Sequence, residues 1–376
     1  METRIRLKER ISKGLDNGLA KLLVGPLGAG KSHFLNHDLY DALSKEKGNK
    51  VVAVNASSFD GVPALLEQKE EGRRLIVLAD DVLSFPHLAW LFDAFAGKRD
   101  VDLIATSSFS PDYALGEEET LLRGRYERFY FSPLPYGDSL ELGRAIDMDE
   151  YLSKGGLFLP KERCLEKTLE EGKRFKRFRS DYLSKARSLM ALVADHLDEP
   201  LSCLKISELS SGEFNRPTLK SYLDFLEGAC LLFPLERENV LKGEIKSCER
   251  AYYLGDLSFQ SKKSKPEGKE KSLILMKLFD EGFSVRSGYA YGNFGEGFSS
   301  EDVAFVAERW RDRIYISYSL GDGSKESETM ARFLKNSYQK IVVVPFDTAP
   351  WKDEEGIIHV GLARFLLSNI SEIVGG

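Results

Sequence analysis

Residues 25–32, GPLGAGKS, fit the phosphate-binding pattern G-x-x-x-x-G-K-[ST] at every fixed position. Its glycines let the backbone approach phosphate oxygens, and the successive N–H groups of such a loop form a concave anion site. Lys31 is suited to bind the β- and γ-phosphates, and the Ser32 hydroxyl is suited to bind Mg²⁺. The residues predicted to bind ATP are Gly25, Gly28, Ala29, Gly30, Lys31, Ser32 and His33.

A second chemical signal is the acidic pair Asp80-Asp81, which follows the apolar run 75–79. Nucleotide hydrolases place a carboxylate that binds Mg²⁺ and a carboxylate that activates water after such a strand. We assign the metal role to Asp80, together with Ser32, and the catalytic role of general base to Asp81. A solvated loop is the alternative explanation of an acidic pair, and the upstream phosphate loop favours the functional one.

Five strands are needed to position these residues. Apolar or β-branched runs predict strands at 20–24, 51–55, 75–79, 101–106 and 127–132. Helical segments separate these runs, beginning with one over 32–43 directly after the phosphate loop. The alternation predicts an α/β fold with a doubly wound, largely parallel sheet over residues 1–140, in which strand 51–55 is buried on both faces. Ser107 and Ser108 fall at a strand's carboxyl end, where open α/β sheets bind ligands.

From about residue 140 the pattern changes to helices. Apolar residues spaced by three and four predict helices over 182–197, over 205–209 and from Pro217 onwards. Strand-like runs at 231–235 and 251–254 follow, and this layout is typical of a winged helix, which binds DNA or protein. We therefore assign residues 141–260 to a helical lid and winged-helix domain.

A basic stretch precedes the first of these helices. Residues 173–187 carry seven cations and the single anion Asp181, with Phe175 and Phe178 interleaved. This composition suits the binding of a DNA phosphate backbone, and a solvated helix face is the commoner explanation of such a patch. The cations proposed to contact DNA are Lys173, Arg174, Lys176 and Arg177, with Lys242, Lys246 and Arg250 of the wing as a second surface.

Residues 261–271 contain no apolar side chain and predict an exposed linker. A third domain over 272–376 is expected after it. Its predicted elements are helices near 273–280 and 362–367 and strands near 303–307, 314–319 and 341–344. The glycine- and aromatic-rich segment 288–297 predicts a flexible hairpin, with a second nucleotide site as the alternative.

Composition narrows the class of protein further. A chain of 376 residues with 42% hydrophobic and 30% charged residues suits two or three soluble domains, and its net charge of −6 gives no general attraction to nucleic acid. No apolar leader or 18-residue apolar run is present, so we expect a cytoplasmic protein without a membrane partner. The cysteines form no C-x-x-C pair and predict small buried residues at Cys164, Cys203, Cys230 and Cys248.

Taken in order, these features resemble a prokaryotic family of AAA+-type P-loop ATPases whose C-terminal domain of unknown function ends in a PD-(D/E)xK nuclease-like fold. The family pattern G-x-R-x-x-G-K-[ST] is similar to residues 25–32, with Leu27 where an arginine is usual. The segment Ala79-Asp80-Asp81-Val82 is similar to the family's Leu-Asp-Glu-Ile. Asp81 is one methylene shorter than the family's glutamate, which implies slow hydrolysis.

Further short matches extend the resemblance over nearly the whole chain. Residues 106–108 resemble the family's T-G-S-S segment, and Arg123-Gly124-Arg125 resembles its G-R element. The resemblance implies that Arg125 stabilises charge during hydrolysis, either within its own subunit or on a neighbour's nucleotide in a homo-oligomer. The other matching positions are Asn55, residues 133–136, residues 151–160, Tyr252 and Asp256.

The C-terminal motifs depart most from the family. Residues 302–306 and 316–319 look like its E-V-D-F-x-V and I-E-V-K, with Ala304, Ser317 and Ser319 in place of the aspartate, glutamate and lysine. A divalent cation needs carboxylate oxygens, so the resemblance implies a nuclease-like fold that cleaves no nucleic acid. In the alternative register, Glu301 or Asp302 is the metal ligand and Lys325 or Glu326 completes the site.

Three functions follow from these signals. The first is a Mg²⁺-dependent ATP-binding protein that hydrolyses ATP slowly and switches the position of its C-terminal domains on a protein or nucleic-acid partner. The second is a scaffold that holds nucleotide without turnover. The third is an ATP-dependent nuclease.

Overall fold

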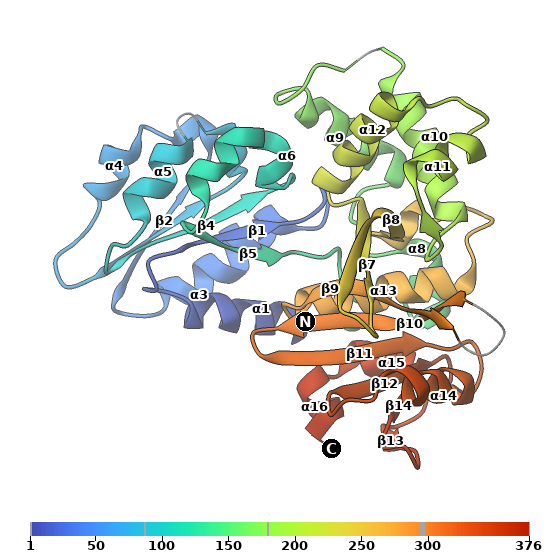
Figure 1. Ribbon diagram of the computed structural model, residues 1–376. Coiled ribbons are helices and arrows are strands. Elements are labelled where there is room, and N and C mark those ends of the chain that lie inside the picture. Colours follow the sequence, from blue (N-terminus) through green and yellow to red (C-terminus); the bar gives the residue numbers. More distant parts are fainter. Residues whose placement is uncertain (1, 86–87, 179, 294–297, 376) are drawn as a thin grey trace. The chain divides into compact units, whose positions relative to one another are not determined.

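The computed structural model describes residues 2–85, 88–178, 180–293 and 298–375. Its chain forms two compact units (Figure 1). The first unit comprises residues 1–134, 157–183 and 224–231, and the second comprises residues 135–156, 184–223 and 232–376. Residues 232–260 and 272–376, which the sequence assigns to different domains, fall in the second unit together.

The first unit contains a parallel sheet of five strands in the order β2-β3-β4-β1-β5. Its strands are β1 (Ala20–Val24), β2 (Asn49–Val54), β3 (Arg74–Ala79), β4 (Val101–Ser107) and β5 (Tyr126–Tyr130). β1, β3 and β4 are almost completely buried, as their apolar composition predicts. β2 differs from the prediction because it is an edge strand, in which Ala53 is exposed.

Helices cover both faces of this sheet (Figure 1). One face carries α1 (Glu2–Lys13) and α3 (Tyr40–Ser44), and the other carries α4 (Val62–Leu66), α5 (Leu88–Phe95) and α6 (Pro111–Leu115). Ile11, Leu39 and Leu23 belong to one buried core cluster on the first of these faces. Each fully buried leucine or isoleucine stabilises the fold by about 1.5–3 kcal/mol. This packing holds β1 in the sheet and thereby positions the phosphate loop, which follows the carboxyl end of β1. The predicted doubly wound α/β domain is confirmed.

An aromatic cluster joins the later segments of the first unit to its sheet. Phe109, directly after β4, contacts Phe175 and Phe225 with ring centroids 5.5 and 6.2 Å apart. Phe178 contacts Phe225 at 5.4 Å. A Cβ on Gly228 would lie 2.4 Å from the Tyr113 ring, so only glycine fits there. The two phenylalanines predicted to accompany a DNA surface therefore pack inside the unit.

The second unit is built on a mixed sheet of nine strands in the order β13-β14-β12-β11-β10-β9-β7-β8-β6. Strands β9, β10 and β11 are antiparallel neighbours, and β11, α14 and β12 form a parallel crossover. β7 pairs with β9, so the strands of the predicted wing and those of the predicted third domain share one sheet. The strand bounds are β6 (Pro200–Leu201), β7 (Leu232–Asn239), β8 (Glu244–Leu254), β9 (Ser284–Asn293), β10 (Phe298–Arg309), β11 (Asp312–Tyr318), β12 (Gln339–Val344), β13 (Trp351–Lys352) and β14 (Ile358–Gly361).

The expected linker over 261–271 is wrong, because α13 (Pro266–Asp280) begins inside it. Ser264 and Gly268 are buried, and a Cβ on Gly268 would lie 2.5 Å from the Leu197 Cβ. The buried charge of Lys271 is compensated by Asp198 and Glu267, whose oxygens lie 2.5 and 2.8 Å from its Nζ. A segment without apolar side chains is thus held by small residues and ion pairs.

Two of the family-like motifs meet in the second unit. The Asp256 carboxylate accepts hydrogen bonds from the backbone N–H groups of Gly156, at 2.7 Å, and Ser258, at 2.9 Å. A Cβ on Gly155 would lie 2.3 Å from Asp256 Oδ1. The paired glycines and this aspartate therefore form a structural contact within the unit.

The remaining helices connect these elements. Their bounds are α2 (Lys31–His33), η1 (Phe34–Leu39), η2 (Ala56–Ser58), η3 (Val82–Ser84), η4 (Gly116–Leu122), α7 (Tyr136–Glu141), α8 (Met148–Lys154), α9 (Lys161–Gly172), α10 (Tyr182–Asp195), α11 (Cys203–Leu209), α12 (Arg216–Gly228), η5 (Leu257–Phe259), α14 (Ser324–Phe333), α15 (Leu362–Leu367) and α16 (Ile370–Gly375). The predicted hairpin forms as β9 and β10, and its residues 294–297 lie outside the described residues. The predicted helix over 32–43 forms as α2, a π-helical turn η1 and α3.

Candidate nucleotide site

The phosphate loop lies between β1 and α2, and its glycines are required by its geometry. A Cβ on Gly25 would lie 2.0 Å from the carbonyl oxygen of Phe131, which no other residue could accommodate. Gly28 and Gly30 have φ angles of +82° and +95°, in the left-handed region that favours glycine. Ala29 is buried, whereas Ser32 and His33 are exposed at the start of the helix.

Lys31 is buried beneath this loop. Its Nζ donates hydrogen bonds of 2.8 Å to the carbonyl oxygens of Gly25 and Pro26. Burial lowers the pKa of Lys31 to about 8, against the attraction of negative groups that include Glu171, Asp80 and Asp81. The lysine therefore lies within the electrostatic reach of the acidic pair, as the sequence predicts.

The carboxyl ends of β1, β3 and β4 bring three polar side chains together. Ser32 Oγ lies 3.0 Å from Asp80 Oδ1, and Thr106 Oγ1 donates a hydrogen bond of 2.6 Å to the same oxygen. The backbone N–H of Asp81 donates to Thr106 Oγ1 at 2.9 Å. Hydroxyl and carboxylate oxygens are the donors that Mg²⁺ prefers, so Ser32 and Asp80 fit the proposed metal role. Ser107, in contrast, bonds locally to the Phe109 carbonyl at 2.5 Å.

Two charged residues beside Asp81 were not predicted for this site. Arg174 Nη1 lies 2.9 Å from Asp81 Oδ2, although the sequence assigned Arg174 to a DNA surface. Glu171, near the end of α9, carries a carboxyl whose pKa is raised by burial and then by repulsion from Asp81. No short motif links these residues to the phosphate loop, so their place could be found only from the fold.

Arg125 is not brought to the nucleotide site of its own chain. Its carbonyl oxygen accepts a hydrogen bond from the N–H of Ala20, at the amino end of β1, whereas the phosphate loop follows the carboxyl end of that strand. Five residues of strand separate the two by ~16 Å. Its guanidinium instead pairs with Asp93 at 3.1 Å. Of the two alternatives for Arg125, only action on a neighbour's nucleotide stays open.

Three other cations of the basic stretch, Lys173, Lys176 and Arg177, are exposed. Lys176 Nζ lies 4.0 Å from the centroid of the Tyr113 ring, a cation–π contact within the first unit. In the wing, Lys242 and Lys246 are also exposed, and Lys246 Nζ lies 5.3 Å from the Tyr289 ring centroid. Residue 179 lies outside the described residues.

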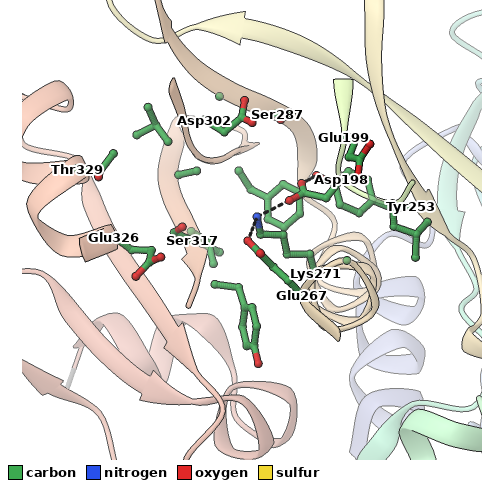
Figure 2. A pocket seen from close by; sticks show the side chains of 18 of the residues that line it. Asp198, Glu199, Tyr253, Glu267, Lys271, Ser287, Asp302, Ser317, Glu326 and Thr329 are labelled. Atoms are coloured by element: carbon green, nitrogen blue, oxygen red, sulfur yellow. Dashed lines mark hydrogen bonds and ion pairs between the residues drawn. The ribbon is translucent and has the colours of Figure 1, made fainter. Parts of the chain in front are cut away.

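The degenerate nuclease motifs line a cavity in the second unit. Ala304 and Ser317 contribute to its walls, together with Asp302, Lys325 and Glu326 of the alternative register (Figure 2). Asp302 is paired with Arg237. Within the part of the chain that the structure describes, no three histidine, cysteine or carboxylate side chains are placed to hold a metal ion.

No family model and no curated protein matches the chain. The RuvB Holliday junction branch migration motor of Thermotoga maritima matches at 15% identity and TM-score 0.28, over 61% of this chain and 88% of that one. Cdc6p of Pyrobaculum aerophilum matches at 13% identity and TM-score 0.30, over 74% of this chain and 93% of that one. AMPPCP-bound DnaA of Aquifex aeolicus matches at 14% identity and TM-score 0.28, over 60% of this chain and 88% of that one. Similarity this low assigns no activity to the chain.

Two expectations from composition can be compared with the structure. Cys164 and Cys230 are buried as expected, but Cys203 is half-buried and Cys248 is exposed. Cys164 Sγ lies 3.2 Å from the carbonyl oxygen of Leu27, which supports the phosphate loop from below. Among the described residues, no helix has the length and apolar character needed to cross a membrane.

Proposed function

We propose that the protein binds Mg²⁺–ATP through residues 25–32, hydrolyses it slowly, and uses nucleotide state to switch how its C-terminal unit engages a partner. The observation that carries this proposal is the contact of Ser32 and Thr106 with one oxygen of Asp80, next to the buried Lys31. Three segments far apart in the sequence thus meet where the phosphate-binding motif requires a metal and a phosphate chain.

Different residues of this site are proposed to bind the phosphates and the metal ion. The N–H groups of the loop and the Lys31 ammonium attract the phosphates, and Lys31 exchanges its two carbonyl partners for phosphate oxygens. Ser32 and Asp80 hold Mg²⁺, which neutralises phosphate charge when bound. Thr106 fixes the orientation of Asp80 and, through the Asp81 N–H, the turn that follows β3.

Slow turnover is supported by the state of Asp81. Its carboxylate is paired with Arg174. The positive charge of Arg174 offsets the negative charge of the proposed base until Arg174 pairs with another anion. The side chains of both residues are more than two-fifths exposed, and such a pair stabilises the structure by less than about 1 kcal/mol. A bound γ-phosphate can therefore compete for Arg174. This ion pair is also the observation that favours the second candidate, a scaffold that holds nucleotide without turnover.

The partner surface is proposed from charge. Lys173 and Arg177 on the first unit and Lys242 on the wing are exposed cations that suit a phosphate backbone.

An ATP-dependent nuclease is the third candidate, since Asp302, Lys325 and Glu326 line one cavity. Arg125 is proposed to act only across a homo-oligomer interface, because its own phosphate loop lies at the opposite edge of the sheet.

Phosphate release from ATP, measured with and without duplex DNA, separates these candidates. We expect slow Mg²⁺-dependent release that DNA stimulates, and Arg174→Gln should change its rate while Arg163→Gln, on the same segment of the first unit, should not. Tight ATP binding without release by the parent protein would favour the scaffold. Cleavage of the DNA would favour the nuclease, and absence of ATP binding would contradict the proposal.

A further inference from the structure

A cavity of about 330 Å³ lies within the second unit, lined by residues of β10, β11, α13 and α14 (Figure 2). Figure 2 shows its polar side chains on two facing walls. Asp198, Glu267 and Lys271 lie on one wall, and Ser317, Glu326 and Thr329 lie on the other.

The charges of the first wall are compensated within the protein. Lys271 pairs with both Asp198 and Glu267, and the Tyr253 hydroxyl donates to Asp198 at 2.5 Å. Two further lining carboxylates are also paired: Glu199 lies 2.6 Å from Lys265, and Asp302 contacts Arg237. This wall therefore requires no ligand to balance its charge.

The second wall is different. Lys325 and Glu326 are consecutive residues in the first turn of α14, and neither side chain has an ion pair or hydrogen bond among the residues that the structure describes. Glu326 Oε2 is shielded from water and has no hydrogen-bond partner among them. Ser317 is 92% buried, and its hydroxyl, which water can still reach, has no hydrogen bond in the described part of the chain. Of these groups, only Glu326 Oε2 is both shielded from water and unsatisfied, which is costly, and a bound ligand is one way to satisfy it.

We propose that this cavity binds a small zwitterion of the α-amino-acid class. Glu326 accepts the α-ammonium, Lys325 at the exposed mouth binds the α-carboxylate, and Ser317 adds a hydrogen bond. An ammonium compensates Glu326, whose Oε2 is shielded from water, and an α-amino acid carries on the neighbouring atom a carboxylate that can also pair with the exposed Lys325. The positive end of the ten-residue helix α14 further favours the carboxylate.

The rest of the lining restricts the side chain of this ligand. Val303 and Ala304 are apolar residues of β10 that line the cavity and pack with the core cluster that contains Met330 of α14. An aliphatic or aromatic amino acid can place its side chain against them and lose apolar surface to water. The proposal does not depend on the nucleotide site, because every lining residue belongs to the second unit.

Titration calorimetry with L-leucine and L-phenylalanine tests the site. We expect at least one of them to bind, its amide to bind at least tenfold more weakly because it lacks the carboxylate, and its N-acetyl form to bind at least tenfold more weakly because it lacks the ammonium. Absence of binding by both amino acids, or equal binding of the amide and the free acid, would overturn the proposal.

Variants locate the binding. Glu326→Gln and Lys325→Met should each weaken it at least tenfold, while Glu328→Gln, an exposed change on the same helix outside the cavity, should leave it unchanged. Thermal unfolding confirms that each variant folds. Lys31→Ala should bind the amino acid like the parent, which separates this site from the ATP site. Unchanged affinity in a folded Glu326→Gln variant would contradict the assignment.

Discussion

The affinity for ATP should depend on pH through Lys31. Burial lowers the pKa of its ammonium to about 8, and phosphates bind the charged form. With that pKa, about nine-tenths of the lysine is charged at pH 7 and about one-tenth at pH 9. The apparent Kd for Mg²⁺–ATP should therefore rise about tenfold between these two values. The Kd rises with pH because the pKa of Lys31 is lowered, so that Lys31 loses its positive charge between pH 7 and pH 9.

Proton uptake provides an independent measure of the same event. Bound phosphates raise the pKa of Lys31, so binding should take up about 0.9 proton per ATP at pH 9 and about 0.1 at pH 7. Titration calorimetry at both values, in two buffers of different ionisation enthalpy and at constant Mg²⁺, measures affinity and uptake together. Lys31→Arg is the matched control, because arginine stays charged throughout and should bind without pH dependence. A Kd that is constant from pH 7 to pH 9, with no buffer dependence, would refute the reasoning.

Three further predictions concern catalysis, DNA and cleavage. Asp80→Ala should abolish Mg²⁺-dependent phosphate release, and Asp81→Asn should keep nucleotide binding but stop turnover; equal turnover in Asp81→Asn would place the base elsewhere. DNA affinity, measured by fluorescence anisotropy, should fall steeply with salt, and absence of binding at low salt would end the nucleic-acid interpretation. It should also weaken when the exposed cations are reversed, namely Lys173, Lys176 and Arg177. Single- and double-stranded DNA should stay intact with Mg²⁺ or Mn²⁺, with or without ATP; cleavage that is lost in Asp302→Ala would show an active nuclease site.

The sequence predicts the contact between the phosphate loop and the acidic pair, because the signals for both are local. Residues 25–32 require a strand before them and a helix after them, and an acidic pair after another parallel strand must end at the same edge of the sheet. The contact of Ser32 with Asp80 follows from these two facts. The position of Arg125 could also have been found from its place just before the fifth strand, which puts it at the opposite edge.

The contribution of Arg174, two residues beyond the end of α9, could not be found in this way. Arg174 lies 93 residues from Asp81 in the sequence, and its charge among other basic residues is equally typical of a solvated or DNA-binding surface. Only the packing of Phe175 and Phe178 against Phe109 and Phe225 brings this segment beside β4. Long-range aromatic packing of this kind leaves no periodic signal.

The linker prediction was wrong for a related reason. Composition detects burial through apolar side chains, and residues 261–271 have none. Ser264 and Gly268 are nevertheless buried because they are small enough for close packing, and Lys271 is held by Asp198 from 73 residues away. The partner that compensates a buried charge is not visible in the segment that carries it.

Binding of Mg²⁺–ATP to the parent protein and to Lys31→Ala tests the central claim most directly. Removing the ammonium deletes charge-assisted contacts of about 1.5–3 kcal/mol and should weaken binding by about ten- to a hundredfold, while the glycines and the backbone of the loop remain. Titration calorimetry at pH 7, with thermal unfolding as the check on folding, measures this difference. We expect clear binding by the parent and a large loss in the variant; equal affinity in both, or no binding by the parent, would contradict the proposed ATP site.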